Sequence, residues 1–105
     1  MTLKKLRRII RKIEELRRRS RSVRSSELER LAKSLGRARI KKQTGEPMYA
    51  ANVESEALAG TRAYAIPSHP GTLPVGTALG ILGSLEADVA RWREWLRSHG
   101  ENGDV

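Results

Sequence analysis

Two short stretches in the second half of this 105-residue chain decide how it folds. They are Ala65-Ile66-Pro67-Ser68-His69-Pro70-Gly71 and Gly76-Thr77-Ala78-Leu79-Gly80-Ile81-Leu82. A proline ends a strand or places it at a sheet edge, because it has no amide hydrogen for a neighbouring strand. A Gly-Thr pair followed by an apolar run is typical of the start of a helix. The two stretches therefore predict a strand, a loop that carries His69, and a helix.

Apolar spacing extends this prediction to both sides. A single helical stripe continues through Leu82, Leu85, Val89, Trp92 and Leu96, which lie three and four residues apart. Upstream, Ser26 and Glu29 have the spacing of a capping box, which predicts a first short helix. Alternating residues over 37–43, the stretch Met48 to Ala51 and residues 62–66 predict three strands. The predicted class is α+β, in the order helix, three strands, helix.

The opening stretches resemble the HicA family of toxins from toxin–antitoxin systems. The matching positions are Pro67, His69, Gly76, Thr77, Ile81 and Leu82, within a resemblance that runs from Ser26 to about Leu96. The resemblance implies a small antiparallel sheet with both helices on one face, similar to double-stranded-RNA-binding domains. It also implies a type II toxin that binds RNA, acts as a metal-independent messenger RNA endoribonuclease, and is neutralised by a HicB-like antitoxin.

The resemblance breaks at the catalytic position. Family members carry a catalytic histidine at the turn before the second strand, and counting back from Tyr49 places Glu46 there. Metal-free RNA cleavage needs a base for the 2′-hydroxyl proton, an acid for the leaving oxygen and cations for the phosphorane. Glu46 as base and His69 as acid would meet this need. The supporting cations would be Arg39, Lys41 and Lys42. The alternative is a solvated turn glutamate and an ordinary loop histidine, which leaves an RNA-binding module without catalysis.

The composition argues against several other kinds of site. The chain has no cysteine, which excludes disulfides and thiolate metal sites. Its two histidines, His69 and His99, lie far apart without carboxylates at ligand spacing, so we expect no metal or other cofactor. No apolar run reaches the roughly 18 residues that a membrane-spanning helix needs. We therefore expect a cytoplasmic protein.

Charge is concentrated at the N-terminus. Residues 1–24 hold eleven Lys or Arg against Glu14 and Glu15, which accounts for the whole net charge of +9. The apolar residues of this segment fall on one helical face: Leu3, Leu6, Ile9, Ile10, Ile13 and Leu16. Cations surround that face, and those expected to contact RNA are Lys4, Lys5, Arg7, Arg8, Arg11 and Lys12. The arginine-rich residues 17–24 are expected to fray, because like charges repel.

This basic amphipathic helix has three interpretations. Its apolar stripe can dock on the domain or on a second copy of the chain, with the charge serving only solubility. Its cations can bind the phosphates of RNA. Lysine and arginine around an aliphatic face also suit an anionic membrane surface, although we expect no membrane partner. The predicted organisation is a helix over 1–24, a HicA-like domain over 25–100 and a tail over 101–105. A protein that only assembles through its apolar helix faces remains a further alternative.

Overall fold

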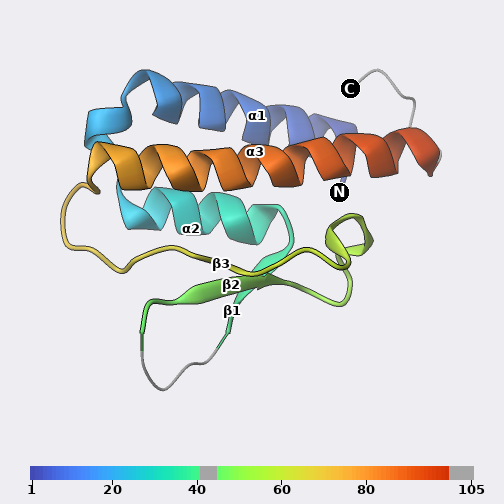
Figure 1. The fold of residues 1–105 in the computed structure, drawn as a ribbon. Coiled ribbons are helices and arrows are strands. Elements are labelled where there is room, and N and C mark those ends of the chain that lie inside the picture. The colour runs from blue at the N-terminus through green and yellow to red at the C-terminus, as the bar shows by residue number, and fades with distance from the viewer. Residues whose placement is uncertain (41–44, 100–105) are drawn as a thin grey trace.

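The computed structural model describes residues 1–40 and 45–99, in which two helices precede a small sheet and a third helix follows it (Figure 1). The helices are α1 (Leu3–Arg18), α2 (Ser25–Ser34) and α3 (Val75–Ser98). The strands are β1 (Arg37–Ile40), β2 (Met48–Ala51) and β3 (Tyr64–Ala65). Two short 3-10 turns, η1 (Ser20–Ser22) and η2 (Glu56–Leu58), lie in the connections. The predicted α+β class, its element order and the additional N-terminal helix are confirmed.

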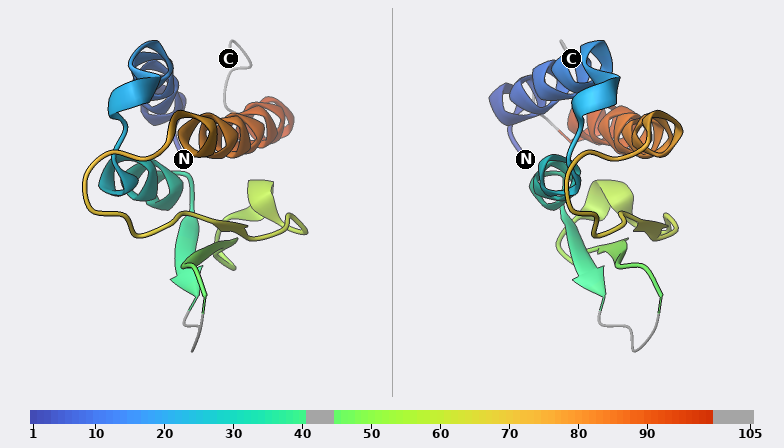
Figure 2. Two further views of the ribbon diagram at one scale, coloured as in Figure 1. Left: turned by 60° about the vertical axis from the view of Figure 1, so that its left-hand side comes forward. Right: turned by 90° about the vertical axis from the view of Figure 1, so that its left-hand side faces the viewer.

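The sheet is antiparallel with strand order β1-β2-β3. Helices α2 and α3 lie side by side over one face, and α1 lies on the far side of this helical layer (Figures 1 and 2). The third strand is shorter than predicted. The amide of Ile66 still donates to the carbonyl of Pro47 at 3.1 Å, but Pro67 then stops the pairing. Residues 41–43 of the predicted first strand lie outside the described residues.

Helix α1 contributes to the same core as the rest of the chain. The side chains that it buries against α3 and its neighbours are Leu6, Ile9, Ile13 and Leu16, each at most 5% exposed. The side chain of Thr2 caps the helix, since its Oγ1 accepts from the amide of Lys5 at 3.1 Å. Burying four large aliphatic side chains stabilises the fold by roughly 1.5–3 kcal/mol each. The N-terminal helix is thus held by packing and not only by its own helical propensity.

Helix α1 ends at Arg18, inside the stretch 17–24 where the helix was expected to fray, and the segment that follows is held by partners from later in the chain. Arg19 forms an ion pair with Glu27 of α2, and its Nη1 donates to the carbonyl of Ser22 at 2.9 Å. The side chain of Val23 is fully buried, and its carbonyl accepts from the amide of Leu73 at 2.8 Å. Carboxylates outside the segment offset the repulsion that the local sequence suggests.

Helix α2 begins one residue before the predicted capping box, and the predicted cap is wrong. Its N-cap is Arg24, whose amide donates to the Glu27 carboxylate at 3.1 Å. The hydroxyl of Ser25 instead contacts the loop after β3. It donates to the carbonyl of Pro67 at 2.5 Å and accepts from the amide of His69 at 3.2 Å. This tertiary contact fixes where the helix starts and also positions the histidine loop.

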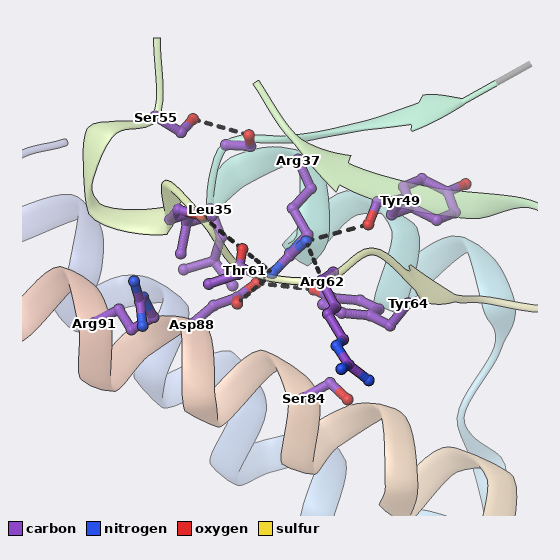
Figure 3. A network of polar contacts seen from close by, with 12 residues as sticks. Leu35, Arg37, Tyr49, Ser55, Thr61, Arg62, Tyr64, Ser84, Asp88 and Arg91 are labelled. Atoms are coloured by element: carbon purple, nitrogen blue, oxygen red, sulfur yellow. Dashed lines mark hydrogen bonds and ion pairs between the residues drawn. The ribbon is translucent and has the colours of Figure 1, made fainter. Parts of the chain in front are cut away.

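A buried ion pair ties the sheet to α3 (Figure 3). Arg37 of β1 donates to both carboxylate oxygens of Asp88, at 2.7 and 2.8 Å, and both side chains are at most 4% exposed. Burial disfavours the charge of the guanidinium, but its hydrogen bonds to the Asp88 carboxylate and the negative charge of that group outweigh burial and raise the pKa of Arg37. Burial and the Asp88 carboxylate raise the pKa of Tyr64, whose hydroxyl donates to Asp88 at 2.9 Å.

The turn between α2 and β1, directly before Arg37, depends on a glycine. Gly36 has φ +103°, and a Cβ there would lie 2.0 Å from the hydroxyl of Ser55. That hydroxyl donates to the carbonyl of Gly36 at 2.8 Å. Only glycine fits both the backbone angle and the close approach. The alternating pattern over residues 37–43 predicted the strand but not the burial of Arg37.

Candidate nucleic-acid interface

The face of α1 opposite its buried stripe is cationic. Lys4, Arg11 and Arg18 lie seven residues apart, so they follow one another along the outward side of the helix. Arg7 and Arg8 lie between the first two, and all five side chains are exposed. A helix of this length is about 24 Å long, at about 1.5 Å per residue. The burial of the opposite side fixes which side chains face solvent.

Some of the predicted cations are already engaged by carboxylates. The Nζ of Lys12 lies 3.0 Å from Glu15 and 3.7 Å from Glu27. The hydrogen bond from Lys12 lowers the pKa of Glu15, although burial opposes the shift. Within residues 1–40 and 45–99, the cations of α1 that face solvent and form no ion pair include Lys4, Lys5, Arg8 and Arg11. Arg18, near the other end of α1, is likewise exposed and forms no ion pair among the described residues, so the available charge extends along the helix.

The predicted RNA-binding set is divided between two sides of the molecule. The cations of α1 lie beyond the helical layer, whereas Arg39 lies on β1, at the sheet (Figure 1). The remaining predicted cations, Lys41 and Lys42, lie outside the described residues. The structure thus brings the α1 cations together but does not place Arg39 beside them.

Glu46 and His69 lie toward the same end of the sheet. The bond between Pro47 and Ile66 brings together the two segments that carry them. Both residues are exposed, and among the described residues no hydrogen bond or ion pair joins their side chains. A base and an acid need fixed positions relative to the reacting hydroxyl, which this arrangement does not supply by itself. The catalytic pair therefore stays a prediction.

Two further arginines adjoin α1 and were missed by sequence reasoning. Arg30 of α2 and Arg8 line a groove of about 310 Å³ between α1 and α2, with Ile9 and Leu31 among its lining residues. Arg93 of α3 lines two hollows between α1 and α3. A signal was present for Arg93, because it follows Trp92 at the edge of the buried stripe of α3. The sequence does not show, however, that α1 packs beside this edge of α3.

Comparisons with family models, curated proteins and solved structures give no match. Across residues 1–40 and 45–99, no group of three or more His, Asp or Glu side chains is arranged to hold a metal ion. No helix in the same residues has the length and apolar character needed to cross a membrane. The case for a function therefore rests on the geometry and charge of the chain itself.

Proposed function

We propose that this chain is a HicA-like RNA-binding protein that holds RNA phosphates on the outward face of α1. The observation that carries the proposal is the orientation of α1. Its apolar side is buried in the core, and Lys4, Lys5 and Arg8 face solvent without carboxylate partners in the described part of the chain. Cations held on a packed helix can release counterions from a polyanion with little further ordering of the backbone.

The same orientation argues against the membrane interpretation of α1. An interfacial helix binds lipid by inserting its aliphatic face below the headgroups. Here Leu6, Ile13 and Leu16 are at most 2% exposed, so that face is already used by the core. The packing likewise leaves little of this stripe for a second copy of the chain. Phosphate binding needs only the face that remains exposed.

Salt-dependent RNA binding tests the proposal. The test variant replaces Lys4, Lys5 and Arg8 with Gln, and the control variant replaces Lys33, Arg62 and Arg97, so both lose three positive charges. Binding of a single-stranded RNA is followed by fluorescence anisotropy over a range of salt concentrations. Each lost phosphate contact changes the log–log salt slope by about 0.7 on single strands, so the test variant is expected to lose about 2 units. The control variant is expected to keep the wild-type slope.

Two outcomes would overturn the proposal. One is that the wild-type chain does not bind RNA at low salt, and the other is that both variants lose slope equally. Truncation is not a suitable test, because removing residues 1–24 also removes five buried core side chains, four from α1 and Val23. Thermal melts of both variants should match the wild-type chain, since exposed substitutions of this kind usually change stability by within about 0.5 kcal/mol.

The toxin part of the proposal concerns a partner and a reaction. We propose a HicB-like antitoxin as partner, and its co-purification from the native operon tests this. For the reaction, the same RNA is incubated in EDTA with the wild-type chain and with Glu46→Gln and His69→Ala. We expect weak or no cleavage, because Glu46 is exposed in its turn and has no described contact that fixes its carboxylate. Strong cleavage that both substitutions abolish would support the Glu46 and His69 pair instead.

A further inference from the structure

A small hollow between α1 and α3 gathers three arginines around one carboxylate. It has a volume of about 280 Å³, and its lining residues are Arg7, Ile10, Arg11, Glu14 and Arg93. A neighbouring hollow of about 300 Å³ shares Ile10, Glu14 and Arg93 and extends to Glu86. Arg11 and Arg93 alone outnumber the single carboxylate of Glu14 in this lining, which favours an anion.

Arg93 is poorly satisfied by the rest of the chain. Its Nε is buried and has no hydrogen-bond partner among the described residues. A buried donor without a partner costs roughly 1–3 kcal/mol, and more when the group is charged. Two residues earlier on α3, Arg91 donates to the carbonyls of Ala57 and Ala59, both at 3.0 Å. The contrast indicates that Arg93 is not held in place by the fold in the way that Arg91 is.

Arg11 adds a second available guanidinium on the opposite wall. It is exposed on α1 and forms no ion pair within residues 1–40 and 45–99. Guanidinium groups bind phosphate oxygens through paired N–H donors, which gives them a geometric match that a lysine lacks. Two such groups from two different helices can contact one phosphate from both sides.

We propose that Arg11 and Arg93, with Arg7 beside them, form a phosphate-binding site across the α1–α3 junction. The site takes a backbone phosphate of RNA, and in this respect it rests on the proposed function. Moving Arg93 breaks no hydrogen bond of its Nε, because that buried atom has no partner among the described residues. Glu14 limits the affinity of the site, since its carboxylate lies among the same side chains and repels the phosphate.

Inorganic phosphate tests the site without RNA. The Nε–H resonances of the arginines are followed by ¹⁵N NMR while phosphate is added to the full chain at low salt. We expect saturable shifts at Arg11 and Arg93, and no saturation with chloride at equal ionic strength. Arg93→Gln should abolish the saturation at Arg11, whereas Arg97→Gln should not, since Arg97 is exposed and pairs with Glu94 at 2.9 Å. Equal responses to phosphate and chloride would overturn the site.

RNA binding by variants of the site provides a second test. Arg93→Gln should weaken binding about fivefold and reduce the salt slope by about 0.7, while Arg97→Gln changes neither. Arg93→Lys keeps the charge but loses the paired donors, so an intermediate loss is expected. Glu14→Gln should tighten binding of both phosphate and RNA, whereas Glu54→Gln, which removes the same charge outside this lining, should do so less. Thermal melts confirm that each variant is folded.

The outcomes separate the site from the function on which it rests. If the Lys4, Lys5 and Arg8 variant loses RNA affinity while Arg93→Gln behaves like Arg97→Gln, the RNA-binding proposal stands and this site is wrong. If phosphate still saturates Arg93 but the wild-type chain binds no RNA, the site binds free phosphate and the RNA-binding proposal is wrong.

Discussion

Arg37 and Arg11 are the same type of residue in opposite situations. The guanidinium of Arg37 lies between the sheet and α3, and its side chain is 2% exposed. Besides Asp88, it donates to the carbonyls of Tyr49 and Arg62, both at 3.2 Å, and to the hydroxyl of Thr61 at 3.1 Å (Figure 3). Arg11, by contrast, is exposed on α1 and forms no ion pair in the described part of the chain.

The difference shows that burial and partners decide what a charge does in this molecule. Every donor direction of Arg37 is used inside the fold, and the ring of Tyr64 covers its guanidinium carbon at 4.3 Å. Such a group cannot bind an outside ligand, and its removal leaves an unpaired carboxylate in the interior. An exposed cation contributes little to folding and keeps its charge for a polyanion. Stability and RNA affinity should therefore respond to different arginines.

The largest effect is expected from breaking the buried pair. Arg37→Met should destabilise the protein by about 3–5 kcal/mol, because the charge of Asp88 stays buried without its partner. Thermal or urea unfolding measures this loss. The affinity of the remaining folded molecules for RNA should equal that of the wild-type chain. A loss of affinity in the folded fraction would contradict the division between structural and ligand-binding arginines.

The control for this variant replaces both partners. Arg37→Met together with Asp88→Leu removes the two charges at once, so it should recover a substantial part of the lost stability. Recovery would show that the unpaired charge, and not the lost volume, causes most of the destabilisation. Tyr64 would then lose its acceptor, which makes full recovery unexpected.

An intermediate effect is expected at Glu27, which joins α2 to the segment after α1. Hydrogen bonds from Arg19 and from the amide of Arg24 lower the pKa of Glu27, although burial opposes them. A lowered carboxylate pKa adds stability above the unfolded value of about 4.3 and loses it as the pH falls through the folded pKa. Glu27→Gln should therefore cost about 1 kcal/mol at pH 7 and flatten the decline in stability below about pH 4.3.

Unfolding measured between neutral pH and pH 3 tests this expectation. Glu54→Gln serves as the matched control, because Glu54 is exposed in the loop after β2 and should leave the pH profile unchanged. If Glu27→Gln declines with pH as steeply as the wild-type chain, the acid sensitivity arises from other carboxylates. Glu15 and Glu86 would then be the next candidates, since Lys12 and Arg17 lower the pKa of each respectively.

The fold was predictable where local spacing carries the information. The stripe from Leu82 to Leu96 and the apolar face of α1 follow directly from residues three and four apart. The buried pair of Arg37 and Asp88 was not predictable. The partners are 51 residues apart, and the local sequence around each of them suggests an exposed charge. The start of α2 was misplaced for the same reason, since Ser25 bonds to the distant loop at Pro67.

The candidate interface was predictable only in part. Composition alone places the net charge in residues 1–24. It does not say that Lys12 is engaged by two glutamates or that Arg93 lines one hollow with Arg11 and Arg7. Those facts depend on how α1 docks on α3, and the docking arises from apolar side chains whose packing partners have no local signature. Sequence thus identifies which charges exist, and tertiary packing determines which remain available.

The smallest effect is expected at the ion pair of Arg17 and Glu86. Arg17 is paired, as Arg37 is, but it is exposed, as Arg11 is. The Nε of Arg17 donates to Glu86 at 2.7 Å, but the two side chains are 39% and 43% exposed. An exposed ion pair contributes about 0–1 kcal/mol, so Glu86→Gln should barely change the unfolding midpoint. The same substitution leaves Arg17 of α1 without its carboxylate partner. RNA affinity should therefore rise about twofold, and the salt slope should steepen by at most about 0.7. Anisotropy measures both changes, with Glu54→Gln as the charge-matched control. A stability loss as large as that of Arg37→Met would show that burial does not separate the two kinds of arginine.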